Sequence, residues 1–174
     1  MKRINFKHFF LFTTIALFVS VLLIGCQSSK KKGSNEISVQ HTFANTNWAF
    51  EEQVLDFPFS ISDTTKEYSI EFVLNYDTAT NKLRQLPVTI TLIFPDGQET
   101  YVTSIMDFDR EINKSIMPAA NGNGFNLNLV AFPRKQLNQK GEYHVSFFRK
   151  AEKGDNFGFN NLTLKVLPIK NKKN

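Results

Sequence analysis

The sequence has few of the residues that usually carry catalysis or covalent cross-linking. Its 174 residues include one cysteine, one tryptophan and three histidines. It contains neither the G-x-S-x-G spacing of a serine nucleophile nor the H-E-x-x-H spacing of a zinc site. His144 alternates with Tyr143 and Val145 and is expected on the solvent side of a strand, and His41 has no nucleophile near it in sequence. These absences predict a non-enzymatic protein without a cofactor or a bound metal.

The single cysteine, Cys26, directly follows an apolar N-terminal segment. Three basic residues, Lys2, Arg3 and Lys7, precede an almost unbroken apolar run over residues 9–24. This order is typical of a secretory signal, and the last four residues, 23–26, resemble the bacterial lipobox, in which the cysteine thiol receives a diacylglycerol. The alternative is an uncleaved anchor helix, although the run is slightly shorter than the ~20 residues that span a bilayer. We expect residues 1–25 to be a signal peptide and Cys26 to attach the lipid, which leaves no thiol for an internal disulfide.

The basic excess of the chain lies at its ends. The whole sequence has 21 Lys+Arg against 16 Asp+Glu, but residues 37–169 hold 12 basic and 15 acidic side chains. The lysines cluster in the signal, in a polar stretch at 26–36 that reads as a flexible tether, and in a C-terminal tail at 170–174. A nucleic-acid-binding face needs clustered basic residues within the folded domain. We therefore expect one folded domain at 37–169 and no nucleic-acid partner.

Apolar residues of this domain recur at every second position, which is the period of a half-buried strand. Pro95-Asp96-Gly97 separates two such runs and predicts a hairpin turn. Strands are predicted at 57–61, 68–76, 88–94, 101–105, 125–131, 143–147 and 162–166, with edge strands near 39–43 and 48–50. No window favours an amphipathic helix. The pattern predicts an all-β fold, an antiparallel β-sandwich (Ig-like or jelly-roll-like) of about seven to nine strands, whose core is supplied by the 18 phenylalanines.

Several motifs occur in an order that resembles a known family. Asn47-Trp48 is followed by FPFSISDTTKEY at 57–68, by Phe94-Pro95-Asp96-Gly97, and by KGEY at 140–143. This order is similar to that of the GldH family of gliding-motility lipoproteins of Bacteroidetes. The resemblance implies an envelope lipoprotein that acts through protein–protein contacts in a gliding or secretion-associated assembly. The segment 115–124 departs from the family pattern, because it lacks the tryptophan that family members often carry there.

The residues after the cysteine suggest an address within the cell envelope. Bacteroidetes lipoproteins sent to the cell surface tend to carry acidic residues there, whereas this chain has lysine at 30–32. By resemblance to that sorting rule, we expect a lipid-anchored outer-membrane protein that faces the periplasm. The alternative is that the lysines form only a solvated linker and give no address.

The longest stretch without period-two patterning, 107–124, is the candidate partner surface. It combines acidic residues with apolar residues that are expected to be exposed, namely Asp107, Asp109, Glu111, Ile112, Ile116 and Met117. A charged rim beside apolar anchors is typical of a protein-docking site, and the alternative is a plain connector. The acidic cluster lacks the glycine and the spaced carboxylates of a calcium loop.

Two further kinds of site remain open. Trp48 could serve as a platform for a sugar ring in a periplasmic or surface carbohydrate-binding sandwich, or it could be a core residue. Thr64 and Thr78 follow aspartate in the short Asp-Thr pattern to which Bacteroidetes attach O-glycans. Ordinary turn formation explains the same pattern.

Overall fold

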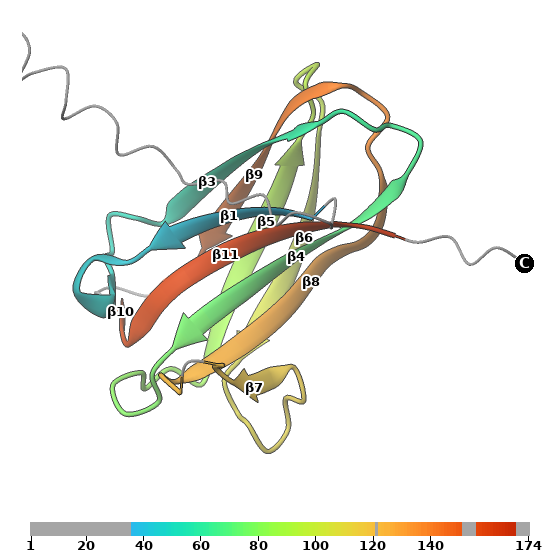
Figure 1. The fold of residues 1–174 in the computed structure, drawn as a ribbon. Helices are drawn as coiled ribbons and strands as arrows, with labels where there is room; N and C mark the ends of the chain where they lie inside the picture. Colours follow the sequence, from blue (N-terminus) through green and yellow to red (C-terminus); the bar gives the residue numbers. More distant parts are fainter. Residues whose placement is uncertain (1–35, 121, 151–155, 170–174) are drawn as a thin grey trace, which may run out of the picture.

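Two antiparallel sheets packed face to face make up the described part of the chain (Figure 1). The structure is a computed structural model that describes residues 36–120, 122–150 and 156–169; the signal segment, Cys26, the tether up to residue 35 and the C-terminal tail lie outside it. The five-stranded sheet has the order β1 (Ile37–Thr42), β11 (Phe159–Pro168), β4 (Glu67–Tyr76), β8 (Phe125–Gln136) and β7 (Ile116–Pro118). The four-stranded sheet has the order β3 (Val54–Ile61), β9 (Gly141–Arg149), β5 (Gln85–Ile93) and β6 (Glu99–Asp107).

The predicted antiparallel β-sandwich is confirmed, with nine strands in its two main sheets. A separate short pair joins β2 (Asn47–Trp48) to β10 (Asn156–Phe157), and a single 3-10 turn covers Ala44–Thr46. β7 was not predicted, because three residues are too few to show an alternating pattern.

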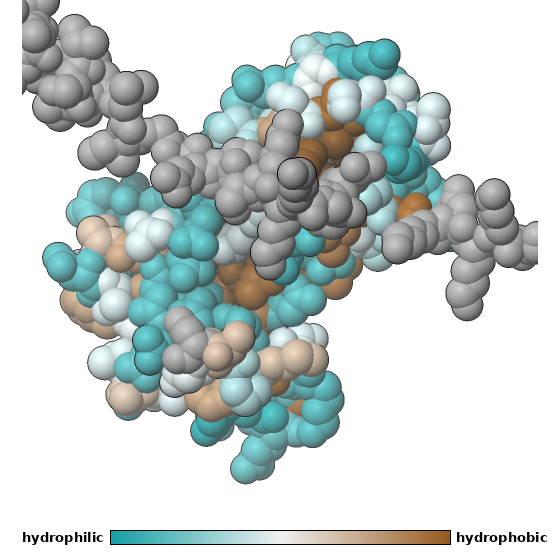
Figure 2. Space-filling model, in the orientation of Figure 1, coloured by the Kyte–Doolittle hydropathy of each residue, from teal (hydrophilic) through white to brown (hydrophobic). Residues whose placement is uncertain are grey.

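The core lies between the sheets and is built from the alternating residues of the long strands. Phe72 of β4 is fully buried, with its ring centroid 5.3 Å from that of Phe57 on β3 and 4.8 Å from that of Phe147 on β9. Strands with a period of two place one set of side chains on each face, so these three rings meet across the interface. In the view of Figure 2, hydrophilic side chains cover most of the surface, and strongly hydrophobic residues show only in narrow strips.

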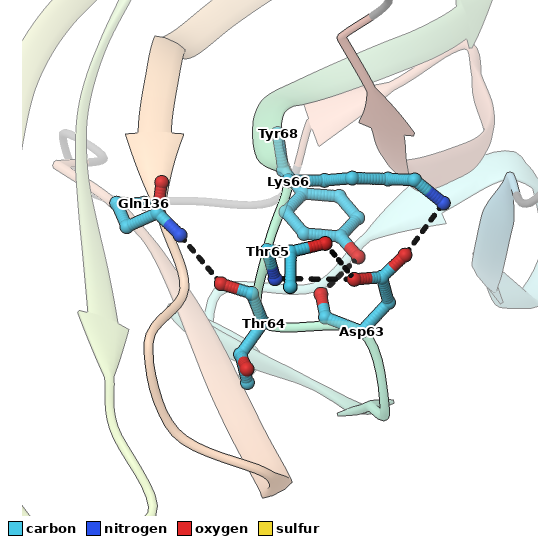
Figure 3. Close-up of polar contacts among 6 residues, drawn as sticks. All are labelled: Asp63, Thr64, Thr65, Lys66, Tyr68 and Gln136. Carbon is cyan, nitrogen blue, oxygen red and sulfur yellow. Dashed lines mark hydrogen bonds and ion pairs between the residues drawn. The ribbon is translucent and has the colours of Figure 1, made fainter.

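The turn between β3 and β4 is fixed by one aspartate and one tyrosine (Figure 3). The Asp63 carboxylate accepts hydrogen bonds from the Thr65 backbone N–H (3.1 Å) and hydroxyl (2.6 Å) and pairs with the Lys66 ammonium at 2.6 Å. The Lys66 and Thr65 contacts lower the pKa of Asp63 to about 2. The Tyr68 hydroxyl donates to the Asp63 carbonyl at 2.7 Å, so the ring ties its own strand back to the turn that precedes it.

A second tyrosine acts in the same way before β9. The Tyr143 hydroxyl donates to the Gln139 carbonyl at 2.8 Å and accepts from the Gln139 N–H at 3.1 Å. The predicted hairpin turn at 95–97 is also present, and Gly97 adopts a left-handed φ of +82° there. A Cβ on Gly141 would lie 3.3 Å from the Pro95 ring, so this turn packs against the start of β9. The motifs that carry the family resemblance therefore include residues that shape turns.

A buried arginine holds the entry segment onto the sandwich. Arg149 is fully buried, and its Nη2 donates to the carbonyls of Trp48 (3.0 Å) and Ala49 (2.6 Å). Its guanidinium carbon lies 5.1 Å from the centre of the Trp48 ring, within the range of a cation–π contact.

Within the described residues no helix is long and apolar enough to cross a membrane.

Replacement of Phe72 by alanine should lower the free energy of unfolding by about 3–5 kcal/mol, the usual range for a buried phenylalanine. Val73, the next residue, has the opposite orientation in β4 and is partly exposed, so Val73→Ala should cost less than half as much. Urea unfolding monitored by fluorescence measures both changes. Equal losses in the two variants would contradict the inward orientation of Phe72.

Candidate functional site

The connection between β6 and β8 projects beyond the end of the sandwich (Figure 1). We call residues 107–118 of this connection the docking loop. Its turns form a series of short side-chain caps on the backbone. Asp107 accepts from the Asp109 N–H, Asp109 from the Glu111 N–H, and Asn113 from the Ser115 N–H, each at 2.9 Å. This repeated capping is the local reason that a stretch without strand periodicity adopts a defined shape.

Ring contacts fasten the docking loop to the sandwich. Phe108 is buried, with its ring centroid 5.1 Å from that of Tyr76 and 5.9 Å from that of Phe159. The Arg110 guanidinium lies over the Phe125 ring of β8 at 4.5 Å. The loop is thus an anchored element of the fold.

The three predicted apolar anchors differ in exposure, and Ile116 is partly buried. Ile116 pairs with Leu127 of β8 and packs against the core, so its prediction as an exposed anchor was wrong. Met117 points the opposite way and is 64% exposed, and Ile112 is 73% exposed. A strand alternates its side chains between faces, and the three-residue β7 was not visible in the sequence pattern. Two apolar side chains therefore remain for a partner.

The three carboxylates of the docking loop also divide into separate roles. Both Asp107 oxygens are used within the fold, one by the Asp109 N–H and the other by the Gln85 amide at 3.0 Å. The Gln85 contact, followed by the Asp109 N–H, lowers the pKa of Asp107. The Oδ2 atom of Asp109 has no hydrogen-bond partner among the described residues, and Glu111 is exposed. The described residues contain no group of three or more potential ligands placed to hold a metal ion.

Of the two interpretations of Trp48, the core residue is confirmed, and its use as an exposed sugar platform or partner-surface residue was wrong. The side chain is 0% exposed, and its ring centroid lies 4.8 Å from that of Phe43 and 5.8 Å from that of Phe147. Its indole N–H donates to the Glu52 carbonyl at 2.8 Å. A sugar ring needs an open aromatic face, and the indole has none.

The outer face of the five-stranded sheet carries a row of amide side chains instead. The Asn75 side chain of β4 accepts a hydrogen bond from Nδ2 of Asn160 (2.6 Å) and donates one to the side-chain oxygen Oδ1 of Asn126 (2.7 Å). Asn75 is buried, so both of its polar ends are satisfied within the sheet. This arrangement leaves the side-chain atoms Nδ2 of Asn126 and Oδ1 of Asn160 without a hydrogen-bond partner among the described residues. Periodicity alone does not reveal this row, because the three asparagines are far apart in sequence.

The two histidines among the described residues, His41 and His144, occupy partly exposed positions. His144 lies between Asp56 (2.8 Å from Nδ1) and Glu142 (3.3 Å from Nε2) on the outer face of the four-stranded sheet. The Asp56 hydrogen bond raises the pKa of His144, which is the direction expected for an imidazolium beside carboxylates. His41 lies 3.9 Å from a carboxylate oxygen of Glu52.

Comparison with known proteins identifies no relative by sequence. No protein-family model matches the chain, and no curated protein matches it. Among solved structures, a carbohydrate-binding module specific for non-crystalline cellulose (CBM28) is similar with a TM-score of 0.45 and 14% identity, over 82% of this chain and 79% of that chain. Latent PorU from Porphyromonas gingivalis gives a TM-score of 0.40 and 8% identity, over 83% of this chain and 14% of that chain. The VP2 subviral particle of infectious bursal disease virus gives a TM-score of 0.37 and 16% identity, over 78% of this chain and 34% of that chain. These likenesses are too distant to bear on ligands or partners.

Thr64 and Thr78 both lie in turns capped by the preceding aspartate. Figure 3 shows the Thr64 side chain pointing away from the Asp63, Lys66 and Tyr68 contacts. Asp77 accepts from the Ala79 N–H at 2.9 Å, which places Thr78 at the tip of a similar turn. Both threonines are partly exposed.

We predict that both hydroxyls carry O-glycans when the protein is produced in a Bacteroidetes host. The intact mass of natively expressed protein should then exceed that of the Thr64→Ala/Thr78→Ala double variant by more than the two side-chain changes, and each single variant should remove part of this excess. Thr80→Ala is the matched control, because this hydroxyl bonds the Asp77 carboxylate at 3.1 Å and does not follow aspartate directly. A wild-type mass that exceeds that of the double variant only by the mass of the two side-chain changes would contradict the prediction.

Proposed function

We propose that the chain is a non-enzymatic, lipid-anchored envelope protein whose β-sandwich docks another protein of the cell envelope through the docking loop. Membership of the GldH family, and with it a place in a gliding or secretion-associated assembly on the periplasmic side of the outer membrane, belongs to this proposal. The observation that carries it is the exposure of Ile112 and Met117 on a loop that the fold holds in one shape. Cys26→Ala should prevent both acyl labelling and cleavage of the signal segment, since the Cys26 thiol is the site of lipid attachment.

The chemistry of the loop suits a protein partner. Ile112 directly follows Glu111, and Asp109 lies two residues before Glu111. The exposed Glu111 carboxylate therefore flanks the exposed Ile112 side chain. Interfaces place apolar anchors inside a polar rim. The cost of ordering the loop on binding is small, because the capped turns and buried Phe108 already fix it.

Burial of Ile112 and of Met117 in the complex should each contribute roughly 1.5 kcal/mol. Replacement of each by serine should therefore weaken partner binding by at least about tenfold, and the double variant Ile112→Ser/Met117→Ser combines the two losses. The measurement is cross-linking and co-purification of the full-length protein from native membranes, with the partner quantified against wild type. The free energy of unfolding should change by less than about 0.5 kcal/mol, since both side chains are exposed in the free protein.

Val130→Ser is the matched control. Val130 is also exposed, but it lies on β8 away from the docking loop, so its replacement should leave partner recovery unchanged. Partner recovery that is undiminished in the double variant would overturn the docking proposal. An equal loss in the Val130 variant would show that the loop is not the specific site.

A second candidate function, carbohydrate binding, is favoured by the amide row. A sugar hydroxyl both donates and accepts, and Asn126 and Asn160 present one donor and one acceptor at places that Asn75 fixes. Asn126 also pairs with Met117 of β7, so an apolar side chain adjoins the row.

Glycan-array binding, followed by calorimetry with the recognised glycan, tests this second candidate. Asn126→Ala should weaken glycan binding by about tenfold, the equivalent of one hydrogen bond at a partly buried site. Ile112→Ser, which lies off the amide row, should leave it unchanged. Absence of any bound glycan, or equal binding by the Asn126 variant, would remove this candidate and leave the docking proposal intact.

A further inference from the structure

At the edge of the four-stranded sheet, β6 has a row of backbone hydrogen-bonding groups without partners among the described residues. Two bonds at the ends of the β5–β6 hairpin fix its pattern: the Phe94 N–H donates to the Gln98 carbonyl (2.8 Å), and the Phe108 N–H donates to the Arg84 carbonyl (2.9 Å). Antiparallel pairs alternate between bonded and non-bonded positions. The even-numbered residues of β6 therefore bond β5, and the odd-numbered residues turn their N–H and C=O groups outward.

The outward groups belong to residues whose side chains are also accessible. Tyr101 is 71% exposed, Ile105 is 56% exposed, and Thr103 between them is exposed. No other described residue hydrogen-bonds the backbone of these three. The edge is closed at one end, where the Asn113 amide donates to the Asp107 carbonyl at 2.6 Å.

The other described strand edges carry features that discourage pairing with another chain. β3 contains Pro58. The Arg149 N–H donates to the Gln53 carbonyl at 3.0 Å, so the odd-numbered residues of β3 bond β9 and the Pro58 nitrogen faces away from β9. β8 continues beyond β7 with the sequence Pro-Arg-Lys at 133–135, and its pairing with β4 has register shifts. β1 and β7 are only six and three residues long. Proline, basic residues, irregular register and short length are the usual protections of an edge.

β6 has none of these protections. It is nine residues long, pairs with β5 in an unbroken register, and contains no proline, lysine or arginine. A long, regular and partly apolar edge is a template for an added strand. We propose that β6 accepts an extended segment of a partner protein, one with basic residues at its ends and β-branched residues between them.

Charge selects this occupant over a second copy of the same chain. Glu99 and Asp107 stand at the two ends of β6, and no described basic residue forms an ion pair with Glu99. Antiparallel pairing of two β6 strands about Thr103 would place Glu99 of each copy opposite Asp107 of the other, and like charges directly opposite destabilise a strand pair. Lysine or arginine at those positions of a partner strand would form an ion pair with Glu99 and would be attracted by the charge of Asp107, whose oxygens are already hydrogen-bonded within the fold. This inference goes beyond the docking loop, because it depends on the β6 backbone and holds whether or not Ile112 and Met117 take part.

A proline at Thr103 tests the backbone requirement. The Thr103 N–H faces outward, so Thr103→Pro removes one donor from the free edge and keeps the bonds to β5, as Pro58 already does on β3. Thr103→Val is the matched control that retains the N–H. The probe is a fluorescent synthetic peptide of alternating threonine and valine with lysine at both ends, and its counterpart has glutamate at both ends. Binding to the full mature chain in detergent is followed by anisotropy.

The lysine peptide should bind at least about tenfold more tightly than the glutamate peptide, and Thr103→Pro should weaken it at least about tenfold while Thr103→Val does not. Hydrogen exchange of wild-type amides at 101, 103 and 105 should slow when the peptide is added. If the proline variant does not fold, two other results test the proposal. They are the hydrogen exchange of wild type and the peptide preference of Glu99→Lys, which should bind the lysine peptide less selectively.

Four outcomes of the peptide and exchange experiments would overturn the proposal. They are no measurable binding of the lysine peptide, equal binding of the two peptides, unchanged binding by a folded Thr103→Pro variant, and protection of amides elsewhere than on β6. Sedimentation that shows a dimer which Thr103→Pro dissociates would identify a second copy as the occupant, and would also overturn it.

Discussion

The structure depends on aromatic packing between two sheets that no disulfide joins within the described residues. Phe72, Phe57 and Phe147 meet at the centre of this interface. Each buried ring removes a large apolar area from water and adds a preferred edge-to-face geometry. The register of the strands is therefore set by the need to keep these rings inside, since a shift of one residue would turn every ring outward.

One end of the core is closed by an unusual combination of an indole and a buried cation. Trp48 fills the space between the sheets, and Arg149 binds the backbone carbonyls of Trp48 and Ala49 at the end of β2. The cation is fully buried, so the carbonyl bonds and the indole face compensate for the water it has lost. A residue that looked like a ligand platform is thus part of what fastens the N-terminal segment of the domain.

The surfaces that remain for recognition are those that the core does not use. The docking loop and the β6 edge are continuous, because β6 ends at Asp107 where the loop begins. The loop offers exposed apolar side chains held by capped turns, and the edge offers backbone groups in a regular row. The amide row lies on the outer face of the other sheet, so protein and glycan contacts would involve different side chains.

The sequence by itself determined the fold class, most strand positions and the hairpin turn at 95–97, because a two-residue period and a Pro-Asp-Gly turn are local properties. The same alternation that buries Tyr143 and Phe147 would also have placed Arg149 inside, although its charge argues against burial. Only the tertiary structure decided which side chains near 107–118 are free. Pairing of β7 with β8 turned Ile116 inward, and burial removed Trp48 from the surface, because both outcomes depend on strands that are distant in sequence. The free edge of β6 was also undecidable from sequence, since an edge exists only once the order of strands in the sheet is known.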